Sequence, residues 1–451
     1  MFKKFTNGCV NLVQRFLPDP FIFCIILTAL VFILAMPLTG QSPLAMVNHW
    51  GGGVWSLLGF SMQMALVLVL GTALANAPAI QKVLKRLAQI PKTPFQSIVF
   101  VTVVSTVACW LNWGFGLVIG AIFAKEIAKQ GKKVDYRLLI ASAYSGFVVW
   151  HAGISGSIPL QVATASETIA EQTSGVITSA IPTAQTIFSP WNLGMCLVIL
   201  ITMPIVNALM HPSPDKVVVI DPKLLMETEV VKTKASTPAE KLEHSRIMSL
   251  IVVLLGLVYI VKYFIGGGSL DLNIVNLIFL TLGVLFHGTP INYVNAITEA
   301  VKGAGGILLQ FPFYAGIMGM MTGANADGVS LASVISDGFV AISTRITFPL
   351  WTFLSAGIVN FFVPSGGGQW AVQAPIMMPA GQALGVNPAV TCMAIAWGDA
   401  WTNMLQPFWA LPALGIAGLG ARDIMGYCII DLLLSGLVVC IGFVIVGFVF
   451  V

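Results

Sequence analysis

One acidic residue stands out in the sequence because it lies inside a long apolar stretch. Asp399 belongs to residues 389–417, which contain no other acidic residue and no Lys or Arg. A carboxylate in such surroundings is costly unless it has a partner, so it usually serves a function. Thr402 and Gln406 follow it and add oxygen ligands of the kind that hard cations prefer. We predict that these three residues hold a cation or carry a proton; the alternative role of Asp399 is to cap an interrupted helix.

A second interruption surrounds His151 in the apolar residues 138–164. Ser155 and Ser157 follow this histidine, with two glycines and a proline among them. These residue types favour irregular backbone. His151 can exchange a proton near neutral pH or bond an anion, and it can equally bond a carbonyl that the break leaves free. We predict that His151, Ser155 and Ser157, with Asn403 from the other break, contact a ligand, although some of these polar groups would only satisfy unwound backbone.

Two short polar turns inside other apolar stretches can bind an anion through backbone N–H groups. No Lys or Arg lies deep in an apolar stretch, so a negative charge would have to be met by helix N-termini. Residues 112–116 and 365–368 have the Asn, Ser and Gly residues that suit such turns. The alternative role of these two turns is a close helix–helix contact that the glycines permit. The predicted anion-binding residues are Asn112, Gly114, Ser365, Gly366, Gly367 and Gly368.

The composition indicates where these residues lie. Of the 451 residues, 57% are hydrophobic and 9% are charged, whereas soluble domains carry about 25% charged residues. The apolar runs are continuous rather than alternating, which favours membrane helices over a β-barrel. The seven cysteines are scattered and form no C-x-x-C pair, so metal or redox chemistry is not expected. This pattern excludes soluble enzymes, nucleic-acid-binding proteins, secreted disulfide scaffolds and disordered chains, and it predicts an all-α polytopic membrane protein.

The basic residues predict the orientation in the membrane, because Lys and Arg favour the cytoplasmic ends of spans. Basic residues between positions 3 and 15 place the N-terminus in the cytoplasm. The apolar residues 95–124 have basic residues on both flanks and are too few for two full spans. We therefore predict a re-entrant hairpin at residues 95–128, followed by a broken helix at residues 138–164.

The second half of the chain repeats the first at an offset of 253 residues. At this offset Asn112 corresponds to Ser365, and the first broken helix corresponds to residues 389–417. The same correspondence predicts a second hairpin at residues 349–378. One additional span, at residues 246–265, inverts the second copy. The expected architecture has two inverted-topology repeats, with about nine crossings and two hairpins. Such repeats with broken helices are typical of secondary transporters.

The predicted domain limits follow from this repeat. Residues 1–210 form the first repeat, and residues 272–451 form the inverted second repeat. Residues 211–271 combine a charged cytoplasmic linker with the additional span.

Four segments carry a recognisable pattern of residues. They are residues 150–160, 397–409, 364–370 and 60–66, with the sequences WHAGISGSIPL, WGDAWTNMLQPFW, PSGGGQW and FSMQMAL. They resemble the short-chain fatty acid transporters of bacteria, and the resemblance extends over nearly the whole chain. It implies a monocarboxylate substrate such as acetoacetate or butyrate. The wider ion-transporter superfamily, to which this family is related, implies two hairpins, two broken helices and an elevator-like dimer.

The sequence and the resemblance together predict a secondary active symporter of short-chain fatty acids, coupled to a cation. The alternative is a cation/proton antiporter on the same scaffold, for which more than one deep acid would be expected. The chain is not expected to be an enzyme, because it has no H-E-x-x-H, G-x-S-x-G or paired Asp motif. A channel is disfavoured because occluded broken helices suit alternating access. No nucleotide-binding motif occurs, which excludes ATP-driven transport.

The predicted location is the bacterial inner membrane, as a multi-pass protein with a cytoplasmic N-terminus. The expected partners are a small monocarboxylate, the lipid bilayer and a second copy of the chain in a homodimer. No nucleic acid is expected to bind. No cofactor is expected apart from Na⁺, if Na⁺ rather than H⁺ is the coupling ion.

Overall fold

The computed structural model describes residues 20–130, 133–165, 168–213, 215, 217–220, 237–360, 363–405 and 407–450. Every regular element within these ranges is a helix. Seven of the helices described there are long and apolar enough to cross a membrane, and four further apolar helices are shorter. The predicted all-α, polytopic membrane fold is confirmed.

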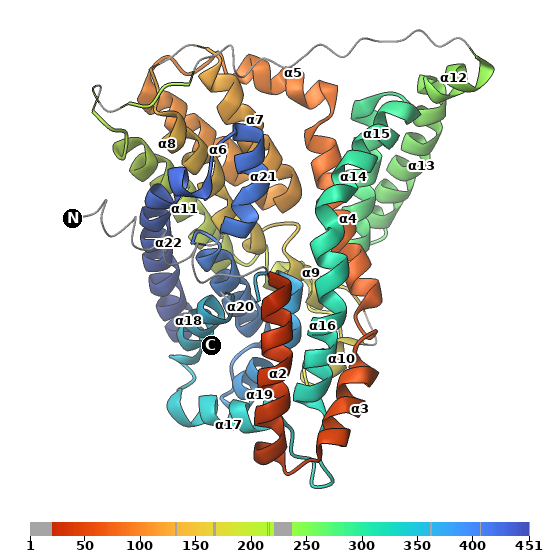
Figure 1. Ribbon diagram of the computed structural model, residues 1–451, viewed down its shortest axis with the longest axis vertical. Coiled ribbons are helices and arrows are strands. Elements are labelled where there is room, and N and C mark those ends of the chain that lie inside the picture. Colours follow the sequence, from red (N-terminus) through yellow and green to blue (C-terminus); the bar gives the residue numbers. More distant parts are fainter. Residues whose placement is uncertain are drawn as a thin grey trace.

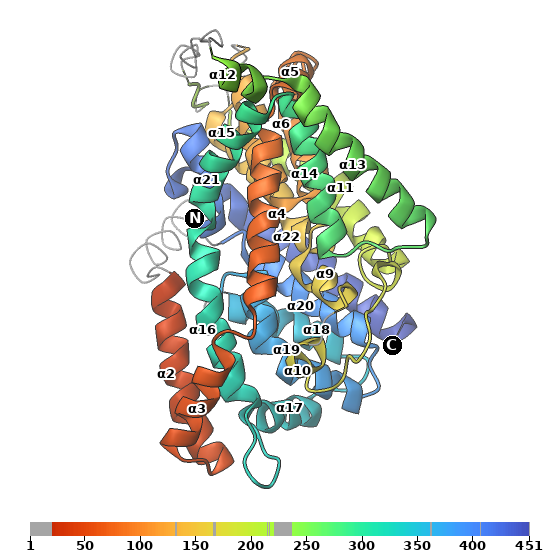
Figure 2. The same ribbon diagram turned by 90° about the vertical axis from the view of Figure 1, so that its right-hand side faces the viewer.

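Within the described residues, each half of the chain has first a set of four α-helices in the same order. The first four are α2 (Pro20–Thr39), α3 (Pro43–Gly53), α4 (Leu58–Ala75) and α5 (Pro78–Leu87). Their counterparts are α14 (Leu272–His287), α15 (Pro290–Val301), α16 (Gly305–Thr322), which the short 3-10 helix η4 (Lys302–Ala304) precedes, and α17 (Leu331–Ile342). Helices α2 and α3 pack against α16, and α14 and α15 pack against α4. The two halves therefore interlock around α4 and α16, which run along the long axis in Figures 1 and 2.

A helical hairpin follows in each half. The first consists of α6 (Pro94–Leu111) and α7 (Trp113–Ala128), and the second of α18 (Phe348–Asn360) and α19 (Gly366–Ala383). Figures 1 and 2 place the first hairpin in the upper part of the molecule and the second in the lower part. The hairpins therefore point toward each other from opposite ends, as inverted repeats require.

The turns of the two hairpins share one local cause. Asn112 caps α7 with φ −156° and ψ 125°, and Ser365, which is 253 residues further along, caps α19 with φ −153° and ψ 116°. In each turn the capping side chain accepts a hydrogen bond from the backbone N–H three residues later. Asn and Ser favour this position because their side-chain oxygens satisfy a free N–H of the first helical turn.

Each half then contains a helix that is broken near its middle. The first consists of α8 (Tyr136–Ser145), the 3-10 helix η1 (Gly146–Ala152) and α9 (Ser157–Ala163). The second consists of α20 (Pro388–Thr402) and α21 (Pro407–Ala417). Helix α21 starts at Pro407, and proline suits a first helical position because the N–H that it lacks would have no partner within the helix there. These bounds agree with the predicted broken helices at residues 138–164 and 389–417.

The remaining helices cover the outside or connect these parts. They are α10 (Thr168–Gln172), η2 (Thr183–Gln185), α11 (Pro190–Leu209), α12 (Pro238–Glu243), α13 (Arg246–Ile265) and α22 (Ala421–Val449). Among the seven candidate spans, the one that contains α13 is the least buried, at 11% of its apolar window, against 94% for the first broken helix. Residues 221–236 of the predicted linker lie outside the described residues. The domain limits stay predictions.

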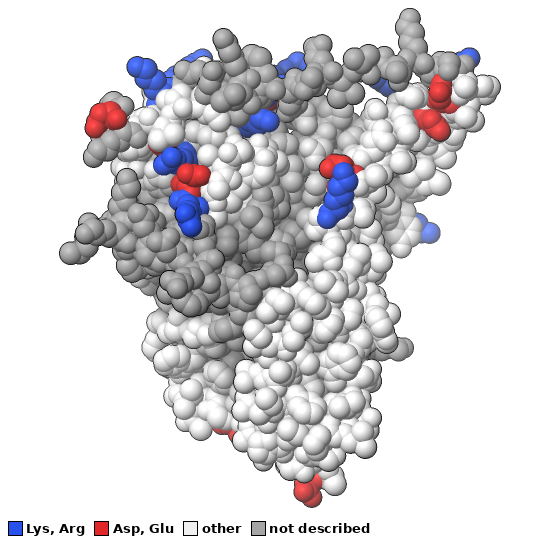
Figure 3. Space-filling view, viewed as in Figure 1, with Lys and Arg blue, Asp and Glu red and all other residues white. Residues whose placement is uncertain are grey.

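The charged side chains are distributed unevenly over the molecule. On the face drawn in Figure 3, the Lys and Arg side chains lie in the upper half, and the lower half shows few charges. Large uncharged surfaces on helices such as α13 suit contact with lipid. Basic residues at one end fit the sequence-based orientation, in which that end faces the cytoplasm; the orientation itself remains a proposal.

A close contact at the first break requires a glycine. A Cβ atom at Gly153 would lie 2.1 Å from the carbonyl oxygen of Trp110, which already accepts the Ile154 N–H at 2.7 Å. We predict that Gly153→Ala lowers the free energy of unfolding by about 1–3 kcal/mol, measured by thermal unfolding in detergent. Gly194→Ala is the matched control, because a Cβ there meets nothing within 4 Å. Equal stability of the two variants would contradict this packing argument.

Candidate functional site

The two broken helices meet at a buried pair of ionisable side chains. His151 in η1 and Asp399 in α20 are 0% and 1% exposed, and His151 Nδ1 lies 3.4 Å from Asp399 Oδ1. The other ring nitrogen, Nε2, accepts a hydrogen bond from the Ile158 N–H at 3.0 Å. Nδ1 therefore carries the ring proton and faces the carboxylate. Asp399 Oδ2 has no hydrogen-bond partner among the described residues, so the carboxylate retains the capacity to bind a cation or a proton.

A cluster of polar groups lies directly beside Asp399. The Nδ2 atom of Asn360, at the end of α18, lies 2.9 Å from the Asp399 carbonyl oxygen, 2.9 Å from Thr402 Oγ1 and 2.9 Å from Asn403 Oδ1. Asn403 Nδ2 lies 3.4 Å from Asp399 Oδ1, and the Tyr144 hydroxyl donates to the Asn403 carbonyl at 2.7 Å. The second hairpin and the second break are therefore joined through one amide, with several oxygen atoms close together.

Two asparagines in this region were missed by sequence reasoning. Asn360 is one; the other is Asn192 in α11, whose Nδ2 donates to the Ala152 carbonyl at 3.1 Å. Its Oδ1 accepts a hydrogen bond from Trp397 Nε1 at 2.9 Å, so it links the first broken helix to the second. Both asparagines are fully buried. The only signal in the sequence was an amide within an apolar helix, which by itself does not identify its partners.

The first hairpin turn uses most of its N–H groups within the protein. Asn112 Oδ1 accepts the Phe115 N–H at 2.8 Å, and Ser155 Oγ accepts the Trp113 N–H at 2.9 Å. Gly114 lies against α4, where a Cβ atom would be 3.0 Å from a backbone oxygen. The structure therefore brings Asn112, Gly114 and Ser155 together in a packed contact.

The second hairpin turn leaves N–H groups available. Ser365 Oγ lies 3.4 Å from the Gly368 nitrogen, a longer contact than its counterpart in the first turn. No described hydrogen bond engages the N–H groups of Gly366 and Gly367, which open α19. Gly366 lies against the histidine of the ionisable pair, since a Cβ there would be 2.6 Å from His151 Cε1. The predicted residues of this turn are thus next to the predicted histidine.

A cavity of about 330 Å³ lies beside the second turn. Pro364 and Ser365 form one side, and the start of α16 forms much of the other. Leu68, Ile307 and Trp409 are among its apolar walls. A mostly apolar cavity with a few polar groups is typical of sites for small organic ligands.

Aromatic side chains pack between the first turn and this cavity. The ring of Trp150 stacks on His151 with centroids 4.0 Å apart. The Trp113 ring lies 5.8 Å from that of Trp150 and 5.3 Å from that of Trp409, which lines the cavity. These rings exclude water from the histidine and extend the apolar wall.

Two further residues were predicted from the sequence to belong to the site, Ser157 and Gln406. Ser157 begins α9 and is 2% exposed, whereas Gln406 lies outside the described residues. The ligand roles of all the predicted site residues stay predictions. Among the described residues, no group of three or more His, Cys, Asp or Glu side chains could hold a metal ion.

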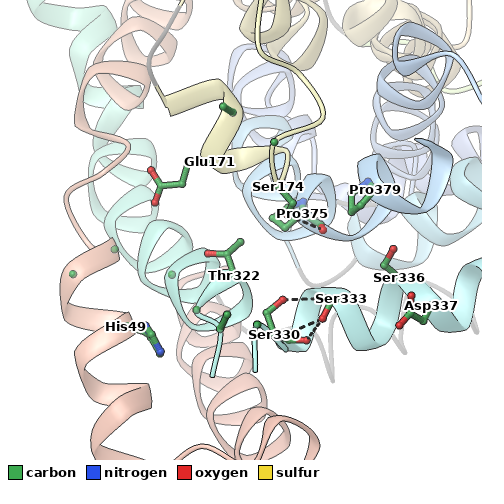
Figure 4. Close-up of a pocket in the computed structure, with 18 of the residues that line it drawn as sticks. His49, Glu171, Ser174, Thr322, Ser330, Ser333, Ser336, Asp337, Pro375 and Pro379 are labelled. Atoms are coloured by element: carbon green, nitrogen blue, oxygen red, sulfur yellow. Dashed lines mark hydrogen bonds between the residues drawn. The ribbon is translucent and has the colours of Figure 1, made fainter. Parts of the chain in front are cut away.

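A wider cavity of about 900 Å³ lies among α3, α10, α16, α17 and α19 (Figure 4), and Figure 1 shows α3, α10, α17 and α19 in the lower part of the molecule. Glu171 and Asp337 approach it from α10 and α17, and His49 approaches it from α3. Among the described residues that line it there is no Lys or Arg, so its charge suits a cation better than a carboxylate. None of the predicted site residues lines it.

Comparison with known proteins decides the family. The short chain fatty acid transporter family matches residues 1–446. The chain belongs to this family. A relative from Escherichia coli (strain K12), assigned as a short-chain fatty acid transporter, is 47% identical over 446 residues, which cover 98% of this chain and 99% of the relative. A second, from Haemophilus influenzae and with the same assignment, is 45% identical over 448 residues, with coverage of 98% and 99%.

Two solved structures share the fold of this family member. The YdaH transporter of Alcanivorax borkumensis, described as having an unusual topology, has a TM-score of 0.59 at 16% identity and covers 95% of this chain and 98% of its own. MtrF of Neisseria gonorrhoeae, described within a class of antimetabolite efflux pumps, has a TM-score of 0.53 at 15% identity, with coverage of 98% and 97%. At such identities the likeness concerns the fold alone.

These comparisons confirm the resemblance found in the sequence. The protein is a multi-pass membrane transporter of the short-chain fatty acid family. Its relatives are transporters rather than enzymes, which confirms the corresponding prediction.

The amide of Asn360 provides a test of the polar cluster. Asn360→Leu would remove the two N–H donors that three buried oxygens share, and we predict a loss of about 1–3 kcal/mol in the free energy of unfolding, measured by thermal unfolding in detergent. Asn295→Leu on the exposed side of α15 is the control and should leave the unfolding temperature near that of wild type. A wild-type unfolding temperature for Asn360→Leu would show that the cluster does not need this amide.

Proposed function

We propose that the protein is a cation-coupled secondary active transporter, a symporter that takes up short-chain monocarboxylates. One observation carries the proposal: at the second hairpin turn, Pro364 and Ser365 line a mostly apolar cavity, and the next two residues open helix α19 with N–H groups that have no described partner. This combination suits a ligand with one carboxylate and a short apolar tail. Membership of the family supports the same substrate class.

The carboxylate binds at the start of α19. The N–H groups of Gly366 and Gly367 meet its charge, with the Ser365 hydroxyl beside them. Because these donors are backbone dipoles at a helix N-terminus, no Lys or Arg is required. The sequence also predicts substrate contacts at the first turn, but Asn112 and Ser155 already accept its N–H groups there. We therefore assign the carboxylate to the second turn.

The coupling ion binds beside Asp399. Na⁺ prefers oxygen ligands, and the Asp399 carboxylate, Thr402 Oγ1 and Asn403 Oδ1 supply them within one cluster. A proton would instead be carried by the pair of Asp399 and His151, whose Nδ1 faces the carboxylate at 3.4 Å. Either ion would neutralise a buried charge close to the second turn, and this proximity couples ion binding to substrate binding.

We further propose alternating access by an elevator-like movement. In this proposal the substrate lies in the cavity between two parts of the molecule. One part is the second hairpin turn with the adjacent broken helices, and the other part is the pair of long helices α4 and α16. Inverted repeats allow two equivalent arrangements of such parts. We also propose that the protein works in the bacterial inner membrane as a homodimer with a cytoplasmic N-terminus; the basic residues at one end of the molecule support this orientation (Figure 3).

The buried pair of His151 and Asp399 favours one alternative, a cation/proton antiporter on the same scaffold. In that mechanism the carboxylate would bind a proton and a metal cation in turn, and no organic acid would be needed. The two functions differ in whether an acid accumulates.

Uptake of labelled butyrate and acetoacetate into proteoliposomes, under separate pH and Na⁺ gradients, tests the proposal. We expect accumulation under one of the two gradients. Asp399→Asn should lower concentrative uptake by at least about tenfold, because it removes the charge that the ion neutralises. Asp327→Asn, at an exposed turn between α16 and α17, is the matched control and should behave as wild type.

Each outcome of this experiment has one meaning. Failure of both acids to accumulate under either gradient would overturn the symporter. Proton movement driven by Na⁺ without any acid would establish the antiporter instead. Unchanged ion dependence in Asp399→Asn would overturn the coupling role of that residue.

A glycine at the start of α16 tests the position of the substrate tail. Gly305 lines the cavity, has helical backbone angles of φ −56° and ψ −39°, and a Cβ there meets nothing within 4 Å. We predict that Gly305→Leu fills the cavity and weakens inhibition by hexanoate at least about tenfold more than inhibition by acetate. Gly59→Leu in α4 is the control, because a Cβ there is also unobstructed. Equal effects on both acids would contradict the assigned tail position.

A further inference from the structure

A second acidic side chain is buried in the membrane-spanning part of the molecule and has no role in the proposed mechanism. Asp431 lies on α22, which begins at Ala421. Its position is about 15 Å along the helix axis, near the middle of a bilayer core about 30 Å thick. The residue is 0% exposed, and neither Oδ1 nor Oδ2 has a hydrogen-bond partner among the described residues.

The helices around Asp431 offer it no positive charge. Helices α8, α11, α18, α20 and α21 pack against α22, and the basic side chains of these six helices are Arg137 and Arg422, in the first turns of α8 and α22. Arg137 pairs there with Asp423 at 3.3 Å. The remaining ionisable side chains on the six helices, apart from Cys428 and Tyr144, carry no positive charge; they are Tyr136, Cys196, Cys392, Asp399, Tyr427 and Cys440.

A carboxylate in such a place is too costly to stay ionised. Removal of an unpaired charge from water costs far more than the binding of a proton to it. Asp431 is therefore neutral in this structure and holds a proton.

Two contacts connect this carboxyl group with the second break. Cys428, one turn earlier on α22, interacts electrostatically with Asp431 and with Tyr144 of α8, and the Tyr144 hydroxyl donates to the Asn403 carbonyl at 2.7 Å. Trp401 Nε1 donates to the carbonyl of Leu432, the residue after Asp431, at 2.7 Å. Asn403 and Trp401 both belong to the segment that holds the polar cluster beside Asp399. A movement of the second broken helix therefore changes the packing around Asp431.

We propose that Asp431 is a proton-binding site, separate from the ion site at Asp399, which exchanges its proton as the second broken helix moves during transport. The O–H bond of the neutral carboxyl group breaks when the site opens to water on one side of the membrane. The carboxylate regains a proton from water on the other side, so the group is unchanged over one cycle. This inference rests on the proposed function and adds a proton to the ion bound beside Asp399.

Two measurements of labelled butyrate in proteoliposomes separate proton coupling from folding. Uptake driven by a pH gradient, after subtraction of uptake into protein-free liposomes, requires net proton movement, whereas exchange of external for internal butyrate requires none. Asp431→Asn keeps the size of the side chain but cannot release a proton. We expect it to lower pH-driven uptake by at least about tenfold and to change the exchange rate by less than about twofold.

Two further variants complete this experiment. Asp423→Asn is the matched control, because it is the same substitution in the first turn of the same helix, where the side chain is 30% exposed; it should keep wild-type uptake and exchange. Asp431→Glu retains a carboxyl group and should recover part of the pH-driven uptake that Asp431→Asn loses.

Infrared difference spectra of the purified protein with and without butyrate give a readout that does not depend on transport. The proposal predicts a change in a carboxylic-acid C=O band, which Asp431→Asn removes and Asp423→Asn keeps. The absence of such a band from the wild-type spectra would overturn the exchange of this proton.

The transport outcomes distinguish this inference from the proposed function. Wild-type pH-driven uptake in Asp431→Asn, or loss of uptake and exchange together in that variant, would overturn the proton site and leave Asp431 a structural residue. Accumulation of butyrate by the wild type under a Na⁺ gradient with no proton movement would also overturn it, while the symporter would stand. Failure of the acids to accumulate under either gradient would overturn the proposed function itself.

Discussion

Backbone that leaves the helix inside an apolar protein must find hydrogen-bond partners nearby, and the centre of this molecule is organised around that constraint. At the first break, His151 accepts the Ile158 N–H, and Asn192 donates to the Ala152 carbonyl. At the second break, Asn360 donates to the Asp399 carbonyl and Tyr144 to the Asn403 carbonyl. Because each break is satisfied largely by side chains, often from another helix, the two breaks are drawn together. Their meeting point is the buried contact between His151 and Asp399.

The two hairpin turns are equivalent in backbone and different in use. Asn112 and Ser365 have almost the same backbone angles, yet the first turn bonds Ser155 and packs against α4, while the second leaves N–H groups beside a cavity. A duplicated chain therefore yields one turn that stabilises the structure and one that is available for a ligand. The difference arises from neighbouring side chains, since Ser155 reaches only the first turn.

Distant and near relatives indicate different properties of the protein, the architecture in one case and the substrate class in the other. Solved transporters at 15% and 16% identity retain the architecture over nearly the whole chain, so the repeats and the broken helices tolerate extensive substitution. The substrate class is indicated instead by relatives at 45% and 47% identity. An architecture of this kind provides helix N-termini and unwound backbone near its centre, and the side chains around them select the ligand.

The sequence by itself determined the features that depend on residues close together along the chain. Apolar runs and their interruptions located both hairpins and both broken helices, because hydropathy and helix-breaking residues act locally. The offset of 253 residues related Asn112 to Ser365, and the isolated charge of Asp399 marked one half of the ionisable pair. Only the tertiary structure decided that His151 faces this carboxylate, that Asn360 joins the hairpin to the break, and which turn borders a cavity. The two contacts of Asp399 join residues 39 and 248 positions apart, and such distances depend on how the helices pack rather than on any pattern along the chain.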